Sequence, residues 1–240
     1  MKTLKTLFLG LGALLATLSF NSCLDDDNSY NTEWGIVTVK PLSSETYYLQ
    51  LDDSTTLLPV NSRAPYFGLE KERRARVYFT LVTDSTPQNY DHAVIINHID
   101  SILTKTIVPS LGEKNDEVYG HDAIDLNSMW IEDGYINFQF TAYFGGAQKH
   151  FINLVQMDET LPYELEFRHN AYNDPWTSTG WGLAAFKLNT LPDTDGKDVM
   201  LKIKVKSYQG DKTYEIKYNT KRPTTGKAPV VGSKELQQLN

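Results

Sequence analysis

The 240-residue sequence contains a single cysteine, Cys23, and its apolar runs are short. No disulfide can form within the chain, so its hydrophobic core must hold the fold together. The apolar run from Leu7 to Leu18 is shorter than the roughly 20 residues that a membrane-spanning helix requires. These features exclude a disulfide scaffold and argue against a spanning helix in this run.

Positive charge is also scarce. The chain has 23 Lys and Arg against 30 Asp and Glu, for a formal net charge of −7. Residues 1–22 carry two lysines and no acids, so the remainder has a net charge of 21 − 30 = −9. An acidic surface repels nucleic acid and anionic lipid head groups. We therefore expect no nucleic-acid partner.

Recognisable catalytic motifs are missing. The sequence has no nucleophile elbow, zinc-binding His-Glu-x-x-His, Walker loop or dinucleotide fingerprint, and its five histidines lack metal-ligand spacing. The run Asp193-Thr194-Asp195-Gly196 resembles part of a calcium loop, but it lacks the later oxygen ligands and the distal glutamate, which favours a turn. We expect no catalytic residues, no metal and no cofactor.

The N-terminal segment is typical of a secretory signal peptide. Lys2 and Lys5 precede the apolar run, and small residues lead up to Cys23. A lone cysteine at this point predicts a bacterial lipoprotein, with residues 1–22 removed and a diacylglyceryl group on Cys23. The alternative is an ordinary cleaved signal with a leftover thiol. That is disfavoured because a stray thiol is a liability outside the cell.

Beyond a polar tether at residues 23–32, the chain alternates with period two, which predicts many short strands. Residues 46–52 and 55–60 are expected to form a hairpin around Asp52-Asp53-Ser54. Gly145-Gly146 predicts a tight hairpin into 150–156. Val199, Leu201, Ile203 and Val205 should face the core, with Lys202, Lys204 and Lys206 in water. Residues 105–121, rich in polar residues and glycine, are the expected domain boundary.

Several segments resemble the NigD-like lipoprotein family. In the first half these are Gly35–Val39, Tyr47–Asp53 and the run ending Ile102-Leu103-Thr104-Lys105. In the second half they are Met129-Trp130-Ile131, Tyr135–Phe138, Phe144–Gly146, His150–Val155 and Leu165–Ala171. The resemblance implies an all-β protein with an OB-type barrel at 33–107, a β-sandwich at 120–222 and a tail at 223–240. It implies no activity and no catalytic residues.

Two short motifs suggest roles outside the core. Asp25, Asp26 and Asp27 look like a signal that routes lipoproteins of this family's hosts to the outer face of the outer membrane; the alternative is a plain soluble tether. Trp176 and Trp181 lie in a segment with Pro and Gly, where they could stack on a sugar or grip a protein partner. The favoured alternative places one or both indoles against the end of the sandwich.

Two further pairs of side chains, each with at least one histidine, could form contacts. His98 and Asp100 share a strand face and could orient one another, although a polar surface face is favoured. His150 and His169 could meet across strands and line a site, but a hydrogen-bonded structural role is favoured.

Three functions remain open. The first is a non-catalytic outer-membrane lipoprotein, displayed at the cell surface or facing the periplasm, that binds a glycan or an outer-membrane protein. The second is a bacteriocin-associated immunity or accessory lipoprotein, as the family name suggests. The third is a hydrolase whose site is assembled from distant strands. Neighbouring polysaccharide-utilisation genes would favour the first and bacteriocin genes the second.

Overall fold

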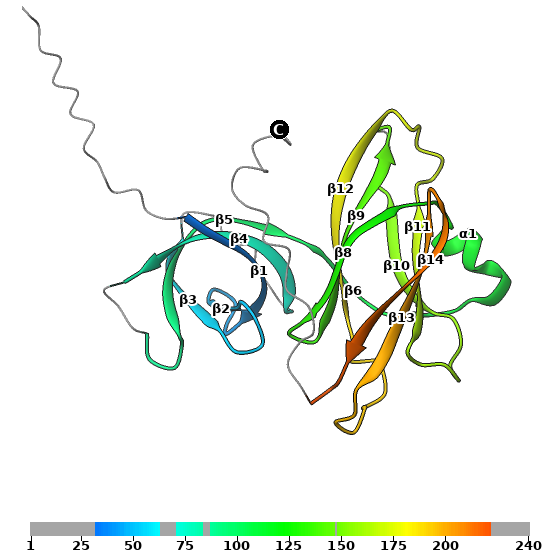
Figure 1. The fold of residues 1–240 in the computed structure, drawn as a ribbon. Helices are drawn as coiled ribbons and strands as arrows, with labels where there is room; N and C mark the ends of the chain where they lie inside the picture. Colours follow the sequence, from blue (N-terminus) through cyan, green and yellow to red (C-terminus); the bar gives the residue numbers. More distant parts are fainter. Residues whose placement is uncertain (1–31, 63–70, 84–86, 147, 222–240) are drawn as a thin grey trace, which may run out of the picture. The chain divides into compact units, whose positions relative to one another are not determined.

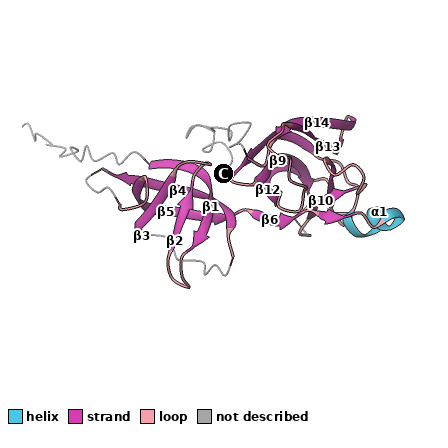
Figure 2. Ribbon diagram, turned by 90° about the horizontal axis from the view of Figure 1, so that it is seen from below, coloured by secondary structure: helices cyan, strands magenta, loops and turns pink. Residues whose placement is uncertain are grey.

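Strands dominate the structure, as the period-two alternation predicts (Figure 1; Figure 2). The computed structural model describes residues 32–62, 71–83, 87–146 and 148–221. Within these ranges the chain builds a closed five-stranded barrel and two further sheets, of five and four strands. The predicted all-β class is therefore confirmed.

The N-terminal barrel closes because β1 pairs with both β2 and β4, giving the order β1-β2-β3-β5-β4. Its strands are β1 (Thr32–Pro41), β2 (Tyr47–Gln50), β3 (Thr56–Ser62), β4 (Arg73–Val82) and β5 (His92–Ser101). The predicted hairpin is present: β2 pairs with β3, and Asp52 Oδ1 accepts from the Thr55 amide at 2.7 Å. Alternate residues such as Val37, Val39 and Leu49 fill the barrel.

The C-terminal half is a sandwich of two sheets. One has the order β14-β13-β11-β10-β7 and the other β6-β12-β9-β8. Their strands are β6 (Leu103–Thr106), β7 (Val108–Pro109), β8 (Asp125–Glu132), β9 (Tyr135–Phe144), β10 (Phe151–Gln156), β11 (Glu164–Asn170), β12 (Ser178–Lys187), β13 (Val199–Ser207) and β14 (Gly210–Tyr218).

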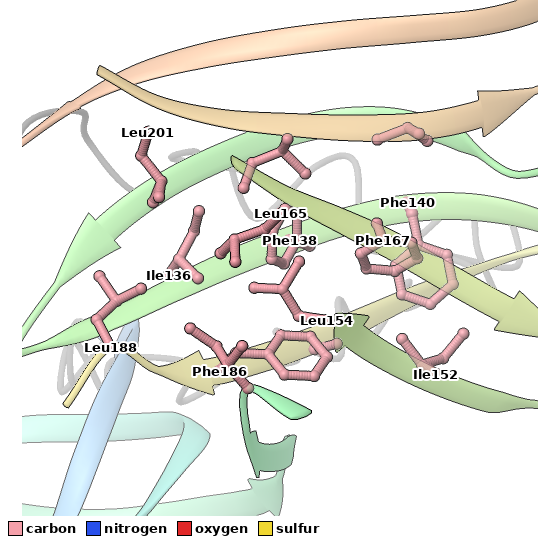
Figure 3. Packing of buried hydrophobic residues seen from close by; sticks show 14 of the residues in the cluster. Ile136, Phe138, Phe140, Ile152, Leu154, Leu165, Phe167, Phe186, Leu188 and Leu201 are labelled. Carbon is pink, nitrogen blue, oxygen red and sulfur yellow. The ribbon is translucent and has the colours of Figure 1, made fainter. Parts of the chain in front are cut away.

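Aromatic and aliphatic side chains from both sheets form the sandwich core (Figure 3). The rings of Phe138 and Phe167, from opposite sheets, have centroids 5.0 Å apart. On β13, Leu201 and Ile203 are fully buried while Lys204 is exposed. The predicted amphipathic strand is therefore confirmed.

The hairpin predicted at Gly145-Gly146 is wrong. β9 pairs with β8 and β12, whereas β10 pairs with β11 and β7 in the other sheet. The glycines therefore carry the chain from one sheet to the other. Both strands bury apolar residues in the shared core. Apolar and polar residues alternate in the same way whether consecutive strands pair in one sheet or face each other across a sandwich, so the pattern does not distinguish the two arrangements.

The boundary expected at 105–121 lies earlier than predicted. β6 pairs with β12, β7 pairs with β10, and Ile107 lies in the sandwich core. The rest of the segment forms η1 (Gly112–Lys114) and the short helix α1 (Asn115–Tyr119), where Tyr119 is buried and donates to the Pro109 carbonyl. The buried contacts of a few apolar residues outweigh the polar composition. Neither helix within the described ranges is long and apolar enough to span a membrane.

Barrel and sandwich belong to one unit, residues 31–240. Arg74 of β4 is fully buried, donates to Asn137 and Thr38 at 3.1 and 3.0 Å, and pairs with Glu132 of β8. An apolar cluster accompanies these bonds, formed by Ile36, Ile102, Trp130, Tyr135 and Ala185. The two domains thus share a polar and an apolar contact.

Candidate functional site

Two aromatic residues, Tyr143 and Trp181, lie close together on the outer face of the four-stranded sheet. β9 sends Phe138 and Phe140 into the core, so Thr141 and Tyr143 point to the opposite face. The register of β12 sets Trp181 opposite Thr141 and Thr179 opposite Tyr143. Trp181 and Tyr143 are therefore diagonal neighbours on one face.

Two glycines flank Trp181 on the inner face and explain its local sequence. A Cβ at Gly182 would lie 2.6 Å from Cζ of Phe140, and one at Gly180 would lie 3.0 Å from the ring of Phe144. The neighbouring strand's rings thus occupy the space on the core side. Trp181 remains on the outer side with 37% of its surface exposed.

Trp176 belongs to an aromatic cluster with Tyr143 and Tyr208. Its ring stacks on Tyr143 at 5.0 Å with planes 9° apart and meets Tyr208 edge-on at 5.4 Å. The Tyr143 amide donates to the Tyr208 hydroxyl at 3.1 Å. Trp176 nevertheless has 68% of its surface exposed, so this indole is not buried inside the sandwich.

Hydrogen bonds to the buried side chain of Asp174 hold the loop that carries Trp176. Tyr172 and Asn173 both adopt left-handed backbone angles, with φ of 51° and 59°, and this conformation needs local support. Asp174 supplies it: its buried carboxylate accepts from the amides of Gly145 and Gly146 at 2.5 and 3.2 Å. Only a glycine fits at 145, because a Cβ there would lie 2.6 Å from Cδ of Pro175.

His150 and His169 do meet across strands, as the sequence suggests. His169 Nε2 lies 2.8 Å from His150 Nδ1, and His150 Nε2 lies 3.3 Å from Asp174 Oδ2. Phe144 stacks on His150 at 4.3 Å. Burial, together with the neighbouring His150, lowers the pKa of His169 to about 4. Since the side chain of His150 is only 4% exposed and His169 is also buried, the pair supports the Trp176 loop and does not line an open site.

A second group of polar and aromatic side chains approaches Trp181 from the barrel. The Arg76 guanidinium lies 5.4 Å from the Trp181 ring and 5.7 Å from the Tyr78 ring. Arg76 also pairs with Asp100 at 2.8 Å, and Asp100 contacts His98 at 2.9 Å. His98 and Asp100 thus contact each other on an exposed face, in agreement with the favoured polar surface. We call Arg76, Tyr78, His98 and Asp100 the barrel cluster.

A cavity of about 450 Å³ lies elsewhere, lined in part by Asp53, Asp133, Lys187 and Lys221. Asp133 is already paired with Lys40 at 2.9 Å, and its amide donates to Asp53 at 2.7 Å. Charges of both signs line this cavity.

The remaining predicted sites differ in outcome. Cys23, Asp25, Asp26 and Asp27 lie outside the described residues. Asp193 accepts from the Asp195 amide at 2.9 Å, which closes the turn favoured for the calcium-like run. Among the described residues, no group of three or more His, Cys, Asp or Glu side chains is arranged to hold a metal ion.

Sequence reasoning missed Tyr143, Tyr208 and Arg76. Tyr143 lies at an outward-facing position of β9, and its place in the period-two pattern is the sequence feature that could have indicated it. Tyr208 lies in the turn between β13 and β14, and no local pattern links it to Trp176.

Comparison with known proteins agrees with this architecture. A family model for the NigD-like N-terminal OB domain matches residues 36–102, and one for the NigD-like C-terminal beta sandwich domain matches residues 106–218. No curated protein matches the chain.

Several solved structures are similar. A candidate toxin-related protein from Parabacteroides distasonis is 41% identical, with a TM-score of 0.74 over 80% of this chain and 95% of that one. A NigD-like immunity protein from Bacteroides caccae is 19% identical, with a TM-score of 0.64 over 80% and 99%. A candidate lipoprotein from Bacteroides fragilis is 14% identical, with a TM-score of 0.57 over 80% and 100%; the last two share only the fold. From the two domain matches and the 41% identical relative, the chain belongs to the NigD-like family.

Proposed function

We propose that this protein is a non-catalytic, lipid-anchored binding module of the outer membrane, and that the outer face of its four-stranded sheet binds a glycan. The observation that carries the proposal is Trp176, 68% exposed yet held flat against Tyr143. An indole held in one orientation stacks on a sugar ring at little cost in conformational entropy. His150 and His169, which contact each other next to the Trp176 loop, are buried and do not reach a ligand on the surface.

The lipid anchor is proposed at Cys23 because a basic start and an apolar run precede this lone cysteine. The name of the similar candidate lipoprotein agrees with this proposal. Replacing Cys23 by Ala should leave an uncut or soluble precursor. Palmitate labelling and membrane fractionation test this, and a labelled membrane band unchanged in the variant would contradict it.

Asp25, Asp26 and Asp27 are proposed to direct the protein to the cell surface. Once several acyl chains fix it to a membrane, the adjacent sequence can decide only which face it occupies. Changing all three to Ala should lower its accessibility to protease on intact cells at equal total protein. Unaltered accessibility would leave these residues as a plain tether.

Glycan binding is tested by intrinsic fluorescence during titration with oligosaccharides. Trp176→Ala should reduce the shift while leaving the melting temperature nearly unchanged, because the indole lies mostly in water. Met200→Ala, an exposed apolar residue of the other sheet, is the matched control. A large drop in the melting temperature of Trp176→Ala would show a structural role instead.

A second candidate is a bacteriocin-linked immunity or accessory role. It is favoured by the names of two similar structures, one toxin-related and one an immunity protein. Expression in a bacteriocin-sensitive strain should then confer protection, and Trp176→Ala should reduce it. Gene neighbourhood separates the two candidates, as polysaccharide-utilisation genes favour the glycan and bacteriocin genes favour immunity.

A further inference from the structure

Trp181 stands between two groups of side chains. On one side, in the next row of the same sheet face, is the aromatic cluster of Tyr143, Trp176 and Tyr208. On the other is the barrel cluster, whose Arg76 guanidinium lies 5.4 Å from the Trp181 ring. Successive outward positions on a strand are about 7 Å apart, so the rows of Trp181 and Tyr143 offer two separate stacking surfaces.

The barrel cluster presents polar groups of a kind that bind hydroxyls. Asp100 accepts from Arg76 through Oδ2 and contacts His98 through Oδ1, and its side chain is still 42% exposed. A carboxylate offers about four acceptor positions and a guanidinium five donors, so capacity remains after this pair has formed. Partial burial opposes ionisation of Asp100, but hydrogen bonds from Arg76 and His98 hold the pKa of its carboxyl below its ordinary value.

The cluster's charges balance. The positive charge of Arg76 is matched by Asp100, which is more exposed than Arg76, at 42% against 23% of the side chain. An acidic sugar would approach this carboxylate and be repelled by it. Neutral vicinal hydroxyls instead donate to Asp100 and accept from Arg76 without bringing uncompensated charge.

We infer that Arg76 and Asp100, with Trp181, form a second subsite, so that the face takes a neutral oligosaccharide of at least two sugar rings. One ring stacks at the aromatic cluster and another lies over Trp181 with its hydroxyls on the Arg76–Asp100 pair. This inference rests on the proposed glycan-binding function and adds the class of sugar and the residues that select it.

The test compares neutral and acidic probes on the full chain by isothermal titration calorimetry. The neutral probes are xylohexaose, mannohexaose and maltohexaose, and the acidic probe is hexagalacturonate. At least one neutral probe should bind. Asp100→Asn and Arg76→Gln should each weaken it about tenfold or more, because hydrogen bonds to charged groups are lost.

Glu164→Gln is the matched control, since Glu164 forms an ion pair with Lys202 at 3.1 Å on the other sheet. It should leave affinity within about twofold. Arg76→Lys is a second variant that keeps the charge but loses the planar donor fork, and it should also weaken binding. Melting temperatures of all variants show whether each is folded.

The outcomes separate the two levels of the proposal. If Trp176→Ala weakens binding and folded Asp100→Asn, Arg76→Gln and Arg76→Lys do not, the second subsite is overturned while the proposed function stands. If hexagalacturonate binds more tightly than every neutral probe, the assignment to neutral sugars is overturned. If no probe binds the unmodified protein, both are overturned.

Discussion

His169 is buried against His150, and its environment favours the neutral imidazole. Its pKa is about 4 in the folded protein against an ordinary 6.5. The unfolded chain therefore binds the proton more readily, so this group's contribution to stability is complete above about pH 6.5 and is lost as the pH falls towards 4.

His169→Gln should remove this dependence, because an amide does not titrate. Urea unfolding at pH 7.5 and pH 4.5 should show a larger loss of stability for the unmodified protein than for the variant. Other carboxyl groups titrate in the same range, so the difference between the two proteins is the measured quantity. An equal loss in both would contradict the assignment.

At the scale of single residues, the sequence marked Trp176, Trp181, His150 and His169 as worth attention, and the structure brings the histidines together. The sequence alone could not show that Asp174 supports the Trp176 loop, because that contact forms only where the chain passes from one sheet to the other at Gly145. Arg74 was missed for a similar reason. An arginine on a polar strand face is usually solvated, and the sequence could not show that this one contacts Asn137 and Glu132 of the sandwich.

Among the elements, β13 follows the sequence pattern most closely. Ile203→Ala should cost about 2–5 kcal/mol because the side chain is fully buried. Lys204→Ala, its exposed neighbour, should cost about 0.5 kcal/mol or less. Chemical denaturation of both variants checks the strand's orientation, and equal costs would contradict it.

Strands β6 and β7 pair with strands of the sandwich, so an isolated sandwich domain should need both. A fragment of residues 120–221 lacks both strands and loses the burial of Ile107, worth roughly 2–3 kcal/mol for one aliphatic side chain. A fragment of residues 102–221 retains them and should melt at a higher temperature. Circular dichroism of the two fragments tests this. The shorter one melting at the same temperature would show that β6 and β7 add nothing.

Period-two alternation identifies strands such as β13 but not their partners. β9 and β10 are consecutive, and both contribute to the same core, yet they lie in different sheets. The local residues that predicted a hairpin at Gly145-Gly146 serve equally well as a passage between sheets. Pairing was predictable only where a short turn joins the strands, as at Asp52 and at Gly210.

For the molecule as a whole, the buried pair of Arg74 and Glu132 couples barrel to sandwich. Arg74→Met leaves Glu132 buried without its partner and should cost about 3–5 kcal/mol. The double variant Arg74→Met with Glu132→Leu should recover most of this loss. Urea unfolding measures both, with Lys202→Met as a control on an exposed pair. A neutral single variant would show that the pair contributes no coupling.

The strand order also bears on how this chain reaches its folded state. The barrel closes only when β4 returns to β1, and β6 gains its partner only when Ala184 arrives beside Leu103. Pairings so distant along the chain slow folding, since loop-closure entropy is lost before the contacts form. For a protein that carries the export signal proposed above, slow folding has a use. It lengthens the time during which the new chain stays unfolded enough to be threaded through a secretion channel.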